Sequence, residues 1–168
     1  MSVKWILVDK SLPDKLKFLT DMSDKKILVV DYQANEREEL VRLLKNLRVQ
    51  IIEASDGAQG YDLFKEEKPD LVILEAMLPK LHGFELTKKI FQESKGTVPV
   101  IIITRVYKGP QIRHEALTNF GASEFFESPL NPEAFLETVN KLLSSEDDIE
   151  DTLPDLDTVV KIVSGKVN

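Results

Sequence analysis

Cysteine is missing from this chain of 168 residues, which excludes disulfides, thiolate metal ligands and cysteine nucleophiles. The chain also has no run of about 18 apolar residues, so we predict no membrane span. Its N-terminus has no continuous apolar stretch behind a basic start, so we do not expect secretion. Together these absences fit a cytoplasmic protein.

Basic residues are fewer than acidic ones, with 22 Lys and Arg against 29 Asp and Glu, and the net charge is -7. Surfaces that bind nucleic acid need clustered Lys and Arg, so we expect no nucleic-acid partner. Glycine and proline are also few, at 7 and 8, whereas 42% of the residues are hydrophobic. That content is enough for one domain with an ordinary core and short extensions.

Short apolar runs recur along residues 26–144. Ile27–Val30 and Leu71–Leu74 are continuously apolar, as expected of strands that are covered on both faces of a sheet. Val98–Ile103 repeats this signature with a single proline interruption, and Val49–Ala54 and Glu124–Phe126 are weaker predicted strands.

Apolar residues at helical spacing lie between and after these runs. They predict five helices, marked by Leu40 to Leu47, Ala58 to Phe64, Phe84 to Phe91, Ile112 to Phe120, and Phe135 to Leu143. Asn131 and Pro132 predict the start of the last one. Strands that alternate with helices predict an α/β fold with a parallel sheet and helices on both faces. We expect the flavodoxin-like, doubly wound five-stranded order 2-1-3-4-5.

Two flanks lie outside this predicted unit of residues 26–144. Residues 1–25 are expected to form an N-terminal extension, and residues 145–168 an acidic linker with a short C-terminal segment. Apolar residues between Leu156 and Val163 favour a short helix in that segment, and a strand is the alternative.

Three of the predicted strands end in a polar residue: Asp31, Glu75 and Thr104. In open parallel sheets, ligands bind outside the carboxyl ends of the strands, at the point where the strand order reverses. We therefore predict the functional site at this edge of the sheet.

Sequence motifs surround these three residues. They are the acid-ended strand at Asp31, the M-L-P-x-x-x-G-F loop of Met77–Phe84, the V-P-V-I-I-I-T strand of Val98–Thr104 and the run Gly121–Pro129. In this order and spacing, residues 26–144 resemble the receiver domain of bacterial response regulators in two-component signal transduction. The resemblance implies a phosphorelay in which a strand-end aspartate accepts phosphate. A second acid helps to hold magnesium, and a lysine clamps the phosphoryl oxygens.

The resemblance puts other residues at three of the family's working positions. Glu75 matches the phosphoacceptor, Tyr32 the second acid and Ser128 the lysine. A phenol is a poor magnesium ligand, and glutamate is longer than aspartate by about 1.5 Å. A misplacement near 1 Å can cost roughly a hundredfold in rate. We therefore expect a pseudo-receiver that is not an enzyme and holds no metal ion or cofactor.

Three hypotheses for Glu75 stay open. It could imitate a phosphorylated acceptor, or be a partly solvated acid without a signalling role. The third hypothesis is a residual phosphoacceptor with weak magnesium-dependent phosphotransfer. Asp31 matches the first member of the family's acidic pair, with a loop-end cap as its alternative role.

Loss of the lysine leaves Glu75 without a neutralising cation, and burying an unpaired carboxylate is costly. We hypothesise that Arg105, directly after Thr104, pairs with Glu75 or Asp31. Lys108 is a second candidate, and an Arg105 that points to solvent is the alternative.

The predicted pocket also includes Met77 and Pro129. The resemblance makes Thr104 a switch hydroxyl and Phe125 a switch aromatic, with a plain strand-end hydroxyl and a half-buried ring as the alternative. We expect a cis peptide bond before Pro129. His82 and His114 have no acids at ligand spacing and are predicted to be surface histidines.

The favoured function is a phosphorylation-independent protein-interaction and signalling module. The resemblance implies contacts through the fourth helix, the fifth strand and the fifth helix. Here that surface would include Ile112, Arg113, Leu117, Glu124, Asn131, Glu133 and Lys141. A separate protein, an effector domain and a second copy of the chain are the alternative partners. Nucleotide or small-ligand binding lacks a glycine-rich loop to support it.

Overall fold

The computed structural model describes Met22 and residues 24–144. The predicted N-terminal extension, apart from Met22, Asp24 and Lys25, therefore lies outside the described residues. So do the acidic linker and the predicted C-terminal helix or strand. Met22 is buried and packs against the strands and helices of one core cluster.

The predicted fold class is confirmed. Five parallel strands form one sheet in the order β2-β1-β3-β4-β5. Their bounds are β1 Lys26–Val30, β2 Gln50–Ala54, β3 Leu71–Glu75, β4 Val100–Thr104 and β5 Glu124–Glu127.

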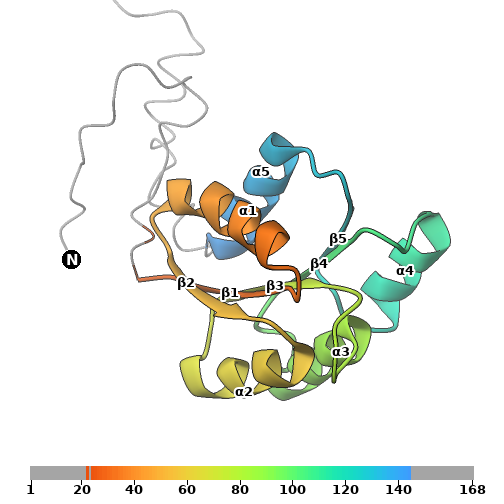
Figure 1. The fold of residues 1–168 in the computed structure, drawn as a ribbon. Coiled ribbons are helices and arrows are strands. Elements are labelled where there is room, and N and C mark those ends of the chain that lie inside the picture. The colour runs from red at the N-terminus through yellow and green to blue at the C-terminus, as the bar shows by residue number, and fades with distance from the viewer. Residues whose placement is uncertain (1–21, 23, 145–168) are drawn as a thin grey trace, which may run out of the picture.

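Helices alternate with the strands along the chain. They are α1 Ala34–Leu44, α2 Gly57–Glu67, α3 Gly83–Ser94, α4 Pro110–Thr118 and α5 Pro132–Leu143, with a short 3-10 turn, η2 Lys45–Leu47. In Figure 1, α1 and α5 lie over one face of the sheet, while α2 and α3 lie over the other. The start of α5 matches its prediction, because Asn131 accepts a hydrogen bond from the Ala134 N–H and Pro132 is the first helical residue.

The core lies on both faces of the sheet because successive strand residues point to opposite sides. In β3, Val72 and Leu74 pack in the cluster that includes α2, α3 and α4, and Ile73 packs in the cluster with α1 and α5. Every residue of β3 and β4 is buried. This explains why both strands read as continuous apolar runs.

Three local predictions need correction. Strand β4 begins at Val100 and not at Val98, because Pro99 has no N–H to donate, although its carbonyl accepts from Val72 N at 3.1 Å. Leu47 lies in η2, beyond the end of α1. Phe120, predicted in the fourth helix, lies beyond the end of α4 at Thr118. Phe91 lies in α3 as predicted, near the end of the helix over Gly121, and is 46% exposed.

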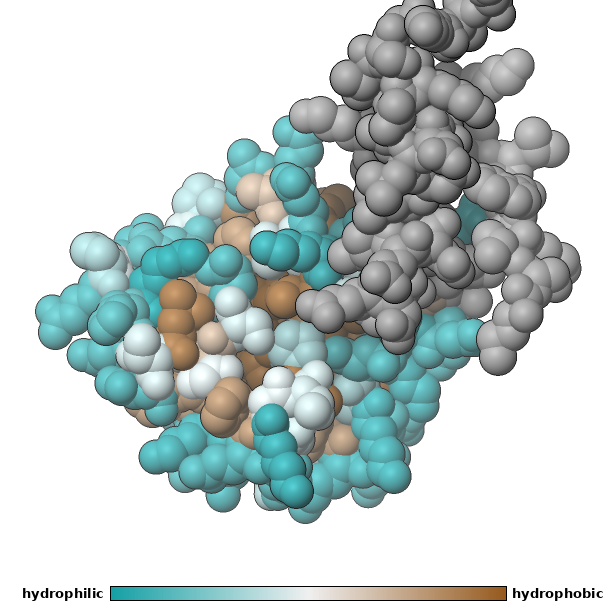
Figure 2. Space-filling model, turned by 180° about the vertical axis from the view of Figure 1, so that it is seen from behind, coloured by the Kyte–Doolittle hydropathy of each residue, from teal (hydrophilic) through white to brown (hydrophobic). Residues whose placement is uncertain are grey.

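The surface seen from behind in Figure 2 is mostly polar, with small apolar patches between polar side chains. Among the described residues, none of the helices is long and apolar enough to span a membrane.

Candidate functional site

The sheet register brings the predicted polar residues to one edge. Val30 pairs with Leu74, so Asp31 and Glu75, the next residues of each chain segment, lie side by side. Glu75 in turn pairs with Ile103, one residue before Thr104. Asp31, Glu75 and Thr104 are all buried.

Arg105 lies over the two acids, as hypothesised from the sequence. Its Nη2 atom is 3.1 and 3.2 Å from the two carboxylate oxygens of Asp31 and 3.0 Å from Oε2 of Glu75. Its other terminal nitrogen, Nη1, is 3.3 Å from Glu36 on α1. The alternative of an Arg105 that points to solvent is wrong, and one guanidinium group faces three carboxylates.

The contact of Arg105 with Glu75 is ionic and is not a hydrogen bond. Oε2 of Glu75 is buried and accepts no hydrogen bond, although Nη2 lies 3.0 Å away, because the N–H is not directed at it. The other oxygen, Oε1, accepts from the Met77 N–H at 3.2 Å. Glu75 is therefore the less well satisfied of the two buried acids.

Burial raises the pKa of Glu75 because it disfavours the charged form. The Met77 N–H and the Arg105 charge oppose this rise in pKa, and the neighbouring Asp31 adds to it. Burial alone would lower the pKa of Arg105, but its hydrogen bond with Asp31 and the charges of the three acids raise it. Arg105 therefore stays cationic, while Glu75 is more easily protonated than an ordinary glutamate.

Tyr32 and Met77 lie at the rim of this site. Tyr32 is 45% exposed, and its hydroxyl accepts a hydrogen bond from the Gln33 amide at 2.7 Å. The Arg105 guanidinium carbon is 6.0 Å from the centre of the Tyr32 ring. Met77 is 41% exposed, and its sulfur accepts from the Tyr107 hydroxyl at 3.3 Å.

Thr104 directs its hydroxyl oxygen at the loop between β4 and α4. That oxygen accepts hydrogen bonds from Val106 N at 3.2 Å and Tyr107 N at 3.0 Å. Phe125, on β5, is fully buried and not half-buried. Its carbonyl accepts a hydrogen bond from Arg113 on α4.

The peptide bond between Ser128 and Pro129 is cis, as predicted. Ser128 donates its N–H to the carbonyl of Thr104 at 2.8 Å. Lys108, the second candidate partner for the buried acids, instead lies 3.4 Å from the Ser128 carbonyl oxygen.

Several residues at this edge were missed in the sequence. Glu36, on the first turn of α1, is the third carboxylate around Arg105. Arg37 donates to the Asp31 carbonyl at 2.6 Å and forms an ion pair with Glu53. The acidic first turn directly after Asp31 was a usable signal for Glu36, whereas no sequence signal pointed to the contacts of Arg37.

The two histidines differ. His114 is exposed, as predicted, but His82 is half-buried and accepts a hydrogen bond from the Phe84 N–H at the start of α3. Its Nε2 atom is 3.3 Å from the Tyr107 hydroxyl. Within residues 24–144, no group of three or more His, Asp or Glu side chains is arranged to hold a metal ion.

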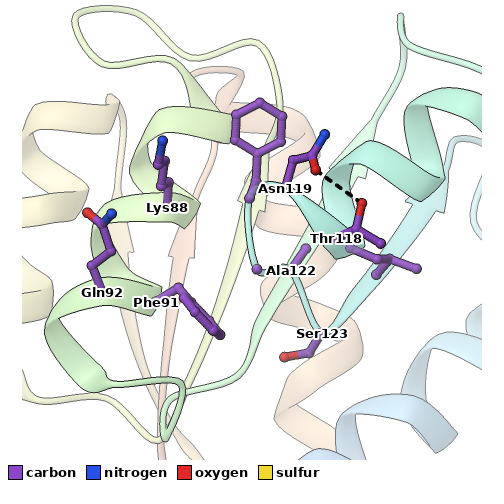
Figure 3. A pocket seen from close by; sticks show the side chains of 10 residues that line it. Lys88, Phe91, Gln92, Thr118, Asn119, Ala122 and Ser123 are labelled. Carbon is purple, nitrogen blue, oxygen red and sulfur yellow. Dashed lines mark hydrogen bonds between the residues drawn. The ribbon is translucent and has the colours of Figure 1, made fainter.

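A separate groove of about 370 Å³ lies between α3 and the segment that joins α4 to β5. Figure 3 shows Lys88, Phe91 and Gln92 on one side and Thr118 and Asn119 on the other. None of the residues predicted at the strand ends lines it, but Leu117 of the predicted partner surface does.

Comparison with known proteins gives a consistent family. The family model described as "Response regulator receiver domain" matches residues 27–140. Protein PilH of Pseudomonas aeruginosa is 30% identical over 120 residues, which are 71% of this chain and 98% of PilH. The alkaline phosphatase synthesis transcriptional regulatory protein PhoP of Bacillus subtilis is 36% identical over 113 residues, covering 65% of this chain and 44% of PhoP. The chain thus spans nearly all of PilH but less than half of PhoP.

Solved structures agree with the sequence relatives. The signal receiver domain of an HD domain-containing protein from Pseudomonas fluorescens is 26% identical, with a TM-score of 0.65 over 71% of this chain and 94% of that one. A response regulator receiver domain protein from Clostridium thermocellum is 25% identical, with a TM-score of 0.64 over the same shares. This chain therefore belongs to the response regulator receiver domain family and has a signalling role.

Proposed function

We propose that this receiver signals through protein contacts without being phosphorylated, because an internal arginine has taken the place of the family's cations. The observation that carries the proposal is the position of Arg105. Its Nη2 atom lies within 3.2 Å of oxygens of both buried acids, Asp31 and Glu75.

A magnesium ion, which the family implies, does not fit the residues present. Magnesium needs near-octahedral oxygen ligands at about 2.0–2.1 Å. Here the oxygens of Asp31 and Glu75 face the nitrogen of Arg105. Tyr32, at the position of the second acid, is half-exposed and bonded to Gln33. We therefore infer no step that uses a metal ion.

The residue at the phosphoacceptor position supports the same proposal. Glu75 is buried at the end of β3, and its oxygens face the Met77 N–H and Arg105. Burial raises the pKa of Glu75, so this residue is protonated, and not nucleophilic, over a wider pH range than an ordinary glutamate. Ser128 brings no positive charge to hold a phosphoryl group, and Lys108 lies at the Ser128 carbonyl.

The partner surface that we propose consists of α4, β5 and α5. Arg113 pairs with Glu124 there, and Ile112 and Leu117 are half-buried between polar neighbours. Mixed charge with modest apolar content suits a transient contact or a dimer. Sedimentation of the parent and of Ile112→Glu would separate a homodimer, which the substitution weakens, from a receiver that stays monomeric until another protein binds.

Incubation with a small phosphodonor and magnesium tests the loss of phosphotransfer. We expect the intact mass of the protein to stay unchanged. A gain of one phosphate that Glu75→Ala abolishes would instead establish a residual phosphoacceptor. The matched comparison is a variant that restores the family's side chains and removes the internal cation, with the substitutions Tyr32→Asp, Glu75→Asp, Ser128→Lys and Arg105→Ala. We expect this variant to gain phosphate under the same conditions.

A further inference from the structure

The loop between β4 and α4 is tied to three neighbouring parts of the fold. Arg105 pairs with Asp31, directly after β1, and with Glu75, at the end of β3. Tyr107 contacts His82 and Met77 in the loop between β3 and α3. Gly109 donates its N–H to Glu127 at the end of β5 at 2.8 Å. These contacts fix the position of the loop relative to the strand ends and to the β3–α3 loop.

The hydrogen bonds of His82 fix the direction of its contacts. Nδ1 accepts from the Phe84 N–H, so in the neutral ring the proton is on Nε2. Nε2 can then donate to the Tyr107 oxygen, 3.3 Å away, and the Tyr107 hydroxyl donates to the sulfur of Met77 at 3.3 Å. The three side chains form one directed chain from the start of α3 to the rim of the acidic site.

The Tyr107 ring is held separately from its hydroxyl. Its centre is 5.4 Å from that of Phe84, which stacks in turn on Phe120 at 5.1 Å. Removing the hydroxyl would therefore leave the ring packed and break only the contacts with His82 and Met77. This separation makes the hydrogen-bonded chain testable without damage to the core.

The chain also reaches the two ends of the acidic site. The backbone N–H of Met77 donates to Glu75, and Thr104 accepts from the N–H groups of both Val106 and Tyr107. A movement of Tyr107 would thus displace the backbone directly after Arg105. The contacts of Arg105 with the acids depend on that backbone.

We propose that His82, Tyr107 and Met77 form a latch that fixes the β4–α4 loop and so holds Arg105 over Asp31 and Glu75. The latch links the acidic site to the proposed partner surface of α4, β5 and α5, because α4 begins directly after the loop. A partner that draws the start of α4 away from the sheet would open the latch and release Arg105. The inference rests on the proposed role of Arg105 as the internal cation of the site.

Hydrogen exchange measured by NMR tests the latch in the whole chain. In Tyr107→Phe, we expect faster exchange of the backbone amides of residues 106 and 107 and of the guanidinium protons of Arg105. The expected increase over the unsubstituted protein is about fivefold, which corresponds to the loss of about 1 kcal/mol of hydrogen bonding. The matched control is Tyr61→Phe, which removes the same atom from a contact with Glu93 between α2 and α3. We expect this control to leave the loop at the parent rates.

Two substitutions of His82 sharpen the test. In His82→Asn, the side-chain oxygen can replace Nδ1 as the acceptor at the start of α3 but cannot reach Tyr107, so we expect fast loop exchange. In His82→Gln, the longer amide can reach the Tyr107 hydroxyl, so we expect exchange closer to the parent rate. Parent-like exchange in both Tyr107→Phe and His82→Asn would overturn the latch. Phosphate gain by the parent would overturn the proposed function and leave the exchange result standing.

Discussion

The interior of the sheet and its carboxyl-end edge are equally buried, but different forces hold them. Ile73 and Ile102 in the interior are 0% exposed, and Asp31 and Glu75 at the edge are 3% exposed. The interior is stabilised by apolar burial, which has no direction and needs no partner. The edge needs a counter-charge for each acid, and Arg105 supplies that charge for both. The charges at the edge can therefore change while the apolar sheet stays the same.

The largest effect is expected in the interior. Ile102→Ala should lower the free energy of unfolding by about 3–4 kcal/mol, because it leaves a cavity between β4 and the helices that cover it. Urea unfolding at neutral and acidic pH measures it. The loss should be the same at both, since no charged group is removed. A strongly pH-dependent loss would contradict the view that apolar burial alone stabilises the interior.

Arg105→Ala should cost about 2–3 kcal/mol at neutral pH, because it leaves two buried carboxylates unpaired. This loss is below the roughly 3–5 kcal/mol expected for a fully buried pair, since the Arg105 side chain is 21% exposed. The cost should shrink in acid as Glu75, whose pKa is raised by burial, becomes protonated. Arg105→Lys is the control. It should recover only part of the loss, because an ammonium group cannot match the planar fork of a guanidinium. A pH-independent loss in Arg105→Ala would mean that Arg105 acts through packing.

Glu75→Gln should raise stability at neutral pH by less than Arg105→Ala lowers it. The folded-state pKa of Glu75 is raised, so folding favours its protonated form. Its contribution to stability is full below the ordinary pKa of 4.5 and is lost as the pH rises through the folded-state pKa. Gln is neutral throughout, so the two proteins should match in acid and diverge as the pH rises. A Glu75→Gln protein that is less stable at neutral pH would show that the charged glutamate is favourable beside Arg105.

The smallest effect is expected for an ion pair at the same edge whose cation is exposed. Lys80 lies 2.7 Å from Asp56, but 67% of the Lys80 side chain is exposed. Lys80→Met should cost about 0.5 kcal/mol, and added salt should remove the difference. The measurement is urea unfolding at low and high ionic strength. A loss as large as that of Arg105→Ala would mean that burial does not decide which ion pairs at this edge matter.

The sequence predicted the sheet well because burial on both faces of a strand forces continuous apolar runs, as in Leu71–Leu74 and Ile101–Ile103. It also predicted that Asp31, Glu75 and Thr104 meet at one edge, since a polar residue at the end of such a run must lie at the carboxyl edge of the sheet. The pairing of Arg105 with Glu75 was predicted because burying a carboxylate without a cation is costly.

Other features depended on side-chain direction, which the sequence does not encode locally. Glu36 contacts Arg105 and Arg37 contacts the Asp31 carbonyl from the first turn of α1, and His82 meets Tyr107 across two loops. Phe91 fitted the helical period of α3 but lies beside Gly121, whose missing side chain leaves room for the ring. Such contacts need the three-dimensional arrangement of separate loops.

A crystal structure of the protein grown with magnesium and beryllofluoride would test most directly whether Arg105 has replaced the family's cations. We predict that neither magnesium nor beryllofluoride binds beside Glu75, and that the guanidinium of Arg105 stays within hydrogen-bonding distance of Asp31. A magnesium ion and a beryllofluoride group both bound at Glu75, with Arg105 displaced, would contradict the account.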